Sequence, residues 1–220
     1  MATDENEIPK TLYHTTLCVI DYHNDASGGT RSVYVLGSHA TLESAKAYTL
    51  KALQELGYEK DEFEKYAERP ASGVWDHGDG VLVYAKAPAG QVFLVGIDTK
   101  PNYEMLLAHP DGSLQLPAGR DHFHYVLQTR IDYNKDRTGA AQRTEIEGSY
   151  LKRSDAFEAA NKCLDKTDFV QYEERESTDT LGKWEYGEDV LVHAVAANGE
   201  NFQVAVRTAP GAHKRHGKKE

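Results

Sequence analysis

Residues 75–101 read WDHGDGVLVYAKAPAGQVFLVGIDTKP, and residues 184–210 read WEYGEDVLVHAVAANGENFQVAVRTAP. The two stretches align without a gap and share the pattern W-x-x-G-x-x-V-L-V-x-A-x-A-x-x-G-x-x-F-x-V-x-x-x-T-x-P. Two unrelated segments of this length are expected to share only one or two identical positions through common residue usage. An internal repeat is therefore the first feature that any account of this chain must explain.

A second pair of blocks extends the repeat toward the N-terminus. Residues 12–55 align without a gap on residues 123–166. The identical positions are Ile20/Ile131, Asp21/Asp132, Tyr22/Tyr133, Asp25/Asp136, Gly28/Gly139, Gly37/Gly148, Ser38/Ser149, Ala45/Ala156, Lys51/Lys162 and Leu53/Leu164. The sequence thus predicts two copies of one module, fused head to tail.

Each module carries the same succession of periodic patterns. Residues 12–22 and 123–133 alternate as strands, a turn follows, and residues 32–36 and 143–147 form the second strands. A helix is predicted over 42–56, ended by Gly57, and its counterpart begins after Ser154 as N-cap. Short helical turns are expected at 61–66 and 168–172. Two strands close each module, at 80–87 with 92–98 and at 189–196 with 202–208.

This order predicts an α+β fold, a tandem duplication of a ββαββ module in which one main helix covers one face of a mostly antiparallel sheet. The copies are expected to pair as a pseudo-two-fold dimer. The predicted organisation is a disordered N-terminus (1–11), module one (12–102), a linker with a hairpin signal at Pro110-Asp111-Gly112 (103–122), module two (123–210) and a basic disordered tail (211–220).

Composition narrows the classes of function. The net charge is −10 and the pI about 5.5, which argues against nucleic acid and against anionic membranes as partners. Two cysteines, Cys18 and Cys163, do not make a disulfide framework, and we expect both buried and unbridged in a cytoplasmic protein. Nucleotide-binding, hydrolase and metalloprotease motifs are absent from the sequence, so no cofactor and no metal is predicted.

Strand parity divides each predicted sheet into two faces. The shared apolar positions are expected to pack on the helix: Ile20, Val33, Val35, Val81, Val83, Phe93 and Val95 in module one, and Ile131, Thr144, Ile146, Val190, Val192, Phe202 and Val204 in module two. The opposite face of module one is predicted to be apolar: Leu17, Val19, Tyr34, Leu36, Tyr84, Val92 and Leu94. Such a face needs a cover, which is the linker hairpin, module two or another protein, including a second copy in a homodimer.

The matching positions of module two are polar, namely Gln128, Arg130, Glu145, Glu147, His193, Asn201 and Gln203. Four of them, Arg130, Glu145, Glu147 and His193, are candidates for acid–base catalysis. The alternative is a solvated sheet face with cross-strand ion pairs.

Three further patterns are weaker candidates. Asp21, Tyr22 and Trp75 recur as Asp132, Tyr133 and Trp184, which fits a ligand pocket with an aromatic wall or a shared structural need. His122 and His124 form an HxH that can serve zinc, although no third ligand is specified. Gly37-Ser38 and Gly148-Ser149 precede helices, where backbone amides can hold an anion.

No motif assigns a chemistry to this chain. The hypothesis that we favour is a non-catalytic binding or protein-interaction protein. The alternatives are a small enzyme, with its site on the polar face of module two or in the inter-module cleft, and an abundant structural or stress-related protein.

Overall fold

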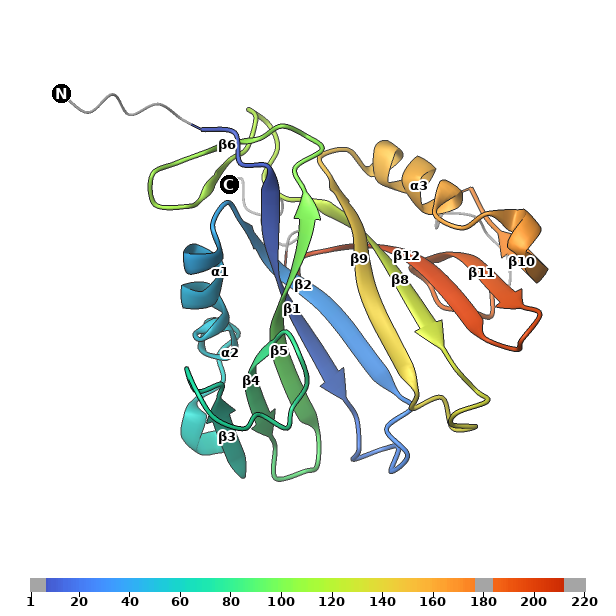
Figure 1. Ribbon diagram of the computed structural model, residues 1–220, viewed down its shortest axis with the longest axis horizontal. Coiled ribbons are helices and arrows are strands. Elements are labelled where there is room, and N and C mark those ends of the chain that lie inside the picture. The colour runs from blue at the N-terminus through green and yellow to red at the C-terminus, as the bar shows by residue number, and fades with distance from the viewer. Residues whose placement is uncertain (1–6, 177–183, 212–220) are drawn as a thin grey trace, which may run out of the picture. The chain divides into compact units, whose positions relative to one another are not determined.

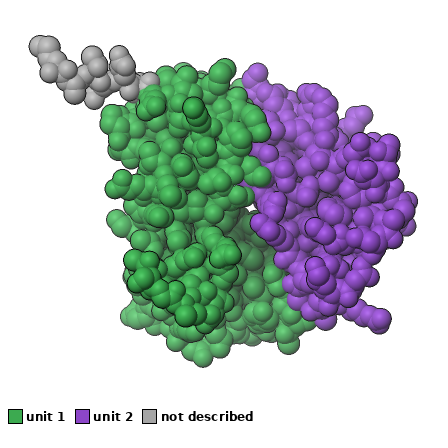
Figure 2. All heavy atoms as spheres, in the orientation of Figure 1, with its two compact units in different colours: residues 1–120 green, residues 121–220 purple. Residues whose placement is uncertain are grey.

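A computed structural model describes residues 7–176 and 184–211 of the chain. It divides into two compact units, residues 1–120 and 121–220 (Figure 2). Most of the predicted disordered termini, 1–11 and 211–220, lies outside the described residues. Each unit is an α+β structure built on a five-stranded antiparallel sheet (Figure 1).

Unit 1 begins with two long strands, β1 (Thr11–Ile20) and β2 (Arg31–His39), which lead into α1 (Leu42–Thr49) and α2 (Ala52–Glu55). A 3-10 turn, η1 (Lys60–Glu62), precedes β3 (Lys65–Glu68), β4 (Val81–Lys86) and β5 (Val92–Pro101). The strand order is β2-β1-β5-β4-β3. The short hairpin of β6 (Leu107–Ala108) and β7 (Leu114–Gln115) completes the unit.

Unit 2 follows the same course. Its elements are β8 (His124–Ile131), β9 (Gln142–Tyr150), α3 (Arg153–Lys162), η2 (Lys166–Asp168), β10 (Phe169–Glu174), β11 (Val190–Ala196) and β12 (Asn201–Thr208). The strand order, read from the other edge, is β9-β8-β12-β11-β10, which is the order of unit 1.

The agreement extends to irregularities. In unit 1, β2 carries an extra residue opposite Thr15/Thr16, and β4 carries one between Val81 and Val83. In unit 2, β9 has the same bulge opposite Val126/Leu127, and β11 has the other between Val190 and Val192. Bulges bend a strand at one defined point. The two sheets therefore share these two bends, and β10 has a further irregularity, between Phe169 and Gln171, that β3 lacks.

The sequence missed one strand per unit. Residues 61–66 and 168–172 were expected to form helical turns, but only η1 and η2 are helical, and β3 and β10 pair with β4 and β11. Both are edge strands. A charged residue stands at each end of the short β3, and in β10 a bulge between Phe169 and Gln171 interrupts the alternation. The module is therefore ββαβββ rather than ββαββ.

The helices differ from expectation at their ends. The helix predicted over 42–56 is broken into α1 and α2, and Gly57, with a φ of 94°, follows the second. Thr41 caps α1 by accepting a hydrogen bond from the backbone N–H of Ser44. In unit 2, Lys152 rather than Ser154 is the N-cap residue of α3.

The predicted division into faces was wrong for the first two strands. Leu17 pairs with Val95, and Val19 pairs with Phe93, so all four share the helix-covered face. Leu36, the extra residue of the β2 bulge, packs against the same cluster. Ile20 and Val35, expected against the helix, lie on the other face with Tyr84, Val92 and Leu94. The seven residues proposed as one interface are thus divided between two faces.

The polar set of unit 2 is divided in the same way. Gln128 lies on the helix-covered face, where it accepts a hydrogen bond from Cys163 Sγ at 3.4 Å, and Glu145 is its cross-strand partner. His193 pairs with Gln203, which pairs with Thr129, so both point to the other face. The physical reason for the error is that residues 17–20 are apolar at both parities, so alternation gives no phase.

The linker hairpin has a different place from the one predicted. Its strand β6 bridges Glu7 through Ala108, and the carbonyl of Gly112 accepts from the N–H of Ala40, just before α1. A Cβ on Gly112 would lie 2.6 Å from Thr41 Oγ1. The hairpin therefore packs at the start of α1, while Ala52 and Leu53 of α2 are the residues that pack against Leu17.

Both cysteines are free thiols, as predicted, but half-buried rather than buried. Burial raises the pKa of the Cys18 thiol, which keeps it protonated. Among the described residues, no helix is both long and apolar enough to cross a membrane.

Candidate functional site: a cationic pocket in unit 2

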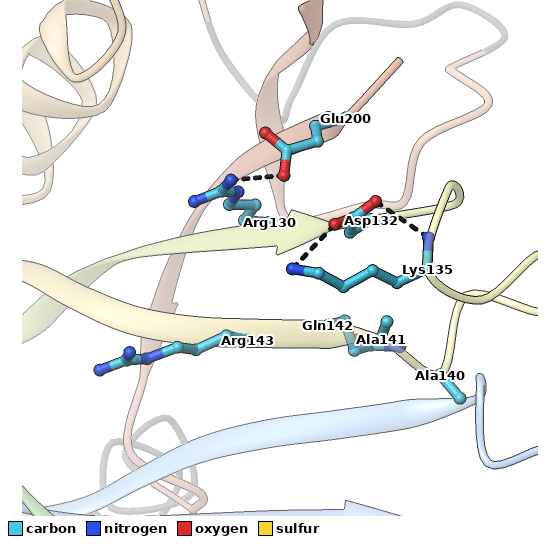
Figure 3. A pocket seen from close by; sticks show the side chains of 8 residues that line it. All are labelled: Arg130, Asp132, Lys135, Ala140, Ala141, Gln142, Arg143 and Glu200. Carbon is cyan, nitrogen blue, oxygen red and sulfur yellow. Dashed lines mark hydrogen bonds and ion pairs between the residues drawn. The ribbon is translucent and has the colours of Figure 1, made fainter. Parts of the chain in front are cut away.

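A pocket of about 320 Å³ lies at the end of the β8–β9 hairpin in unit 2 (Figure 3). Charged side chains dominate its lining, three cationic and two anionic. The lining residues are Arg130, Asp132, Lys135, Ala140, Ala141, Gln142, Arg143 and Glu200. The positions of these residues follow from the fold, because β8 and β9 end here and the turn before β12 brings Glu200 alongside.

Arg130 and Glu200 form the first ion pair of the pocket. The Glu200 side chain is only 9% exposed, whereas that of Arg130 is 54% exposed. Glu200 also accepts from Asn198 Nδ2 at 2.9 Å. The hydrogen bond from Arg130, followed by that from Asn198, lowers the pKa of the Glu200 carboxyl. The carboxylate thus holds the guanidinium and stays ionised.

Asp132 and Lys135 form the second pair, with 3.1 Å between Oδ2 and Nζ. Asp132 also accepts from the backbone N–H groups of Asn134 and Lys135. The contact with the Lys135 side chain is the largest of the causes that lower the pKa of Asp132. The carboxylate therefore has a structural task, which is to close the hairpin turn, while the ammonium of Lys135 remains exposed.

Arg143 stands directly opposite Arg130 in the β8–β9 register. Its side chain is 81% exposed, and its Nε lies 2.8 Å from Glu145 Oε1. Like charges directly across an antiparallel pair destabilise it. The pairing of two arginines at the mouth of the pocket therefore lowers the stability of this hairpin.

Unit 1 has the same hairpin without these three cations, although Arg31 stands at the position of Gln142. The residues at the positions of Arg130, Lys135, Arg143 and Glu200 are Val19, Asn24, Ser32 and Gln91. The turn itself is built alike. Gln142 Nε2 donates to the Gly139 carbonyl at 2.8 Å, and Arg31 Nε donates to the Gly28 carbonyl at 2.8 Å. Charge, not architecture, distinguishes the two hairpins.

Of the residues predicted for the site, the structure brings two into this pocket, Arg130 and Asp132. Sequence reasoning missed Lys135, Arg143 and Glu200. Aligning the two copies and scoring the change of charge at each position would have found them.

The four catalytic candidates do not converge. Arg130 and Glu145 share one face of the sheet, and His193 lies on the other, where its Nε2 is 3.2 Å from Asn201 Oδ1. Glu147 is the extra residue of the β9 bulge. An acid–base site composed of these four side chains is therefore not assembled.

The recurrent aromatic residues belong to two separate structures. Tyr22 and Tyr133 lie against Gly28 and Gly139, where a Cβ would come within 2.6 and 3.3 Å of the ring. Trp75 packs edge-on against His77, which stacks on Tyr84 at 3.8 Å. In unit 2 the ladder is Trp184, Tyr186 and His193, with the second and third residues exchanged and the stacking distance again 3.8 Å. The exchange keeps the contact, which indicates a structural role for the ladder.

The two remaining patterns have structural places. Gly37-Ser38 and Gly148-Ser149 lie inside β2 and β9 rather than at a helix start, so the predicted anion site is wrong. His122 Nδ1 lies 2.6 Å from Asp121 Oδ1, and its ring is 5.0 Å from that of His124. Across residues 7–176 and 184–211, no group of three or more His, Cys, Asp or Glu side chains is placed to hold a metal ion.

No protein-family model matches the chain. A comparison with curated proteins and one with solved structures also gave no match. The geometry of the pocket and the contrast between the two units therefore indicate the function.

Proposed function

We propose that the protein is a non-catalytic binding protein whose ligand site is the pocket at the β8–β9 hairpin. The observation that carries the proposal is the set of unit 2 cations on a hairpin that unit 1 builds without them. Because the unit 1 hairpin folds without these charged side chains, folding of the hairpin does not require them. Ligand binding explains why unit 2 carries them.

Two features of the lining support binding rather than catalysis. The lining contains no histidine, cysteine, serine or tyrosine that could act as a nucleophile or general base near neutral pH. The carboxyls of Asp132 and Glu200 have lowered pKa values because cations and amides hold them. Carboxylates held in this way are weak bases, and near neutral pH they are ionised and carry no proton to donate.

A thermal-shift screen of the full chain against a chemically broad set of small molecules tests this proposal, because a ligand of the native state raises its stability by mass action. The matched variant carries the unit 1 residues at two positions, Arg130→Val with Glu200→Gln. Changing both avoids leaving Glu200 ionised without its partner. We expect ligands that stabilise the natural chain and not the variant. Ligands that stabilise both equally would place binding elsewhere and contradict the proposal.

The duplication predicted from sequence is the second part of the proposal. The common strand order, the bulges at equivalent positions and the equal turn bonds support one ancestral module. In each unit by itself, the helix-free sheet face is rich in apolar residues, with Ile20, Val35 and Val92 in one and Leu127, Ile131 and Ile146 in the other. Such faces favour the pseudo-two-fold pairing that the repeat predicts.

The competing occupant of the unit 1 face is another protein, including a second copy of the chain. Light scattering of the natural chain and of Val35→Asp separates the two. Pseudo-two-fold pairing predicts a monomer that Val35→Asp destabilises without a change of mass. A dimer that dissociates on this substitution would replace the pairing by a homodimer.

A further inference from the structure

We infer that the ligand of the unit 2 pocket is a small oxyanion, a phosphate or carboxylate group, held between Arg130 and Arg143 with Lys135 beside them. This inference rests on the proposed function and adds the chemistry of the ligand. It follows from three properties of the lining: its hydrogen-bonding capacity, its charge and the unfavourable pairing of two arginines.

The hydrogen-bonding capacity of the lining is mainly that of donors. A guanidinium has five N–H groups and an ammonium three. Within the part of the chain that the structure describes, Arg143 uses Nε on Glu145 and Lys135 uses one contact on Asp132. The carboxylate acceptors, by contrast, are occupied. Asp132 accepts from two backbone amides and pairs with Lys135. Glu200 pairs with Arg130 and accepts from Asn198. A ligand that complements this lining must supply acceptors.

The distribution of charge points the same way. The carboxylates lie low in the pocket, 14% exposed for Asp132 and 9% for Glu200, while Lys135 and Arg143 are 75% and 81% exposed. Three cations and two carboxylates line the pocket, and the third cation, Arg143, pairs with Glu145 outside the lining. An incoming anion meets the positive groups first.

The cross-strand pairing of Arg130 with Arg143 indicates where the anion binds, which is between these two side chains. Side chains directly opposite on an antiparallel pair have Cβ atoms about 4.5–5.5 Å apart. This Cβ spacing leaves both long side chains able to reach one oxyanion, which adds charge-assisted contacts to the ion pairs that they make with Glu200 and Glu145. Phe202, the β12 partner of Arg130, supports the guanidinium from one side, with 5.9 Å between its ring centroid and the Arg130 Cζ.

Titration calorimetry of the full chain tests the inference, with inorganic phosphate and succinate as separate probes in a buffer of low ionic strength. The variant is Arg143→Ser, which installs the unit 1 residue at an exposed position. The charge-matched control is Arg137→Ser, in the same hairpin but outside the pocket lining. Arg143→Lys preserves the charge and removes the planar fork.

We expect at least one probe to bind the natural chain, and Arg143→Ser to weaken it about tenfold or more. Arg137→Ser should leave the affinity within about threefold, and Arg143→Lys should fall between the two. Preference for one probe identifies the source of the oxyanion as phosphate or carboxylate.

Failure of both probes at millimolar concentration, or equal weakening by Arg137→Ser and Arg143→Ser, overturns the inference. In that case the proposed function still stands if the thermal-shift screen finds a neutral or cationic ligand that depends on the pocket. It falls only when the screen finds no pocket-dependent ligand of any charge.

Discussion

Unit 1 and unit 2 use the same strands, bulges and turn bonds, and they differ where side chains leave the shared scaffold. Unit 1 buries a histidine, His14, where unit 2 has Tyr125. The aromatic ladders exchange His and Tyr, and the hairpin of unit 2 carries the cationic pocket. The first two differences conserve packing, whereas the third adds three exposed cations and the nearly buried Glu200. Comparison of the two copies thus distinguishes the residues that form the common scaffold from those that the stability of the scaffold does not require.

The largest expected effect concerns the helix-packed core. Leu53 of α2 is 1% exposed within the unit 1 core, whereas its counterpart Leu164 is only partly buried at the margin of the unit 2 core. Leu53→Ala should lower the free energy of unfolding by about 3–4 kcal/mol, and Leu164→Ala by about 1–2 kcal/mol. Denaturant unfolding of the full chain measures both. Equal losses would show that the two cores are packed alike.

The next effect depends on pH and belongs to unit 1 alone. His14 is fully buried, with Nδ1 2.7 Å from Ser38 Oγ, and burial lowers its pKa from 6.5 to about 4. Below pH 6.5 the unfolded chain binds a proton that the folded chain refuses. The folded state therefore loses stability as the pH falls from 6.5 to 4, by roughly 3 kcal/mol in all.

Tyr125 supplies the control, because His14→Tyr places the unit 2 residue in unit 1. We expect the variant to fold and its stability to vary less between pH 6.5 and 4. Denaturant midpoints measured at half-unit steps of pH give the comparison. An undiminished fall in the variant would assign the pH dependence to other groups.

A smaller effect tests the aromatic ladder. His77→Tyr or Tyr84→His alone places two like rings in a stack that both units build from one His and one Tyr. Each single change should cost about 1 kcal/mol. The double variant, which reproduces the unit 2 order, should recover most of the loss, as a double-mutant cycle reports. Additive losses would mean that the exchange between units is accidental.

The repeat, the two long hairpins and the α+β class were predictable because apolar periodicity and turn glycines are local signals. The edge strands β3 and β10 were not, since β3 is short and ends in charged residues and a bulge interrupts the alternation of β10. The faces of β1 and β2 were not either: Leu17 to Ile20 are apolar at both parities, and the bulge at Leu36 reverses the phase along β2. Which side chains of a strand face the helix depends on how that strand pairs with its neighbours. The sequence of a single strand does not determine that pairing.

The candidate site was predictable in part. Arg130 and Asp132 drew attention through strand parity and recurrence, but they were assigned to different sites. The two residues line one pocket together with Glu200, which lies seventy residues farther along the chain from Arg130. The β12 register brings Glu200 beside β8. Long-range register of this kind has no local sequence signal.

The most direct test of the account moves the pocket from one unit to the other. In a chain disabled by Arg143→Ser, the unit 1 hairpin receives the charges of unit 2 through the substitutions Val19→Arg, Asn24→Lys, Arg31→Gln, Ser32→Arg and Gln91→Glu. Asp21 already stands at the position of Asp132, and Phe93 is the β5 partner of residue 19 as Phe202 is of Arg130. Calorimetry with the oxyanion that binds the natural chain should show binding restored to within about tenfold of the original affinity. A folded graft that binds no oxyanion would contradict the claim that one scaffold carries both hairpins and that charge alone makes the site.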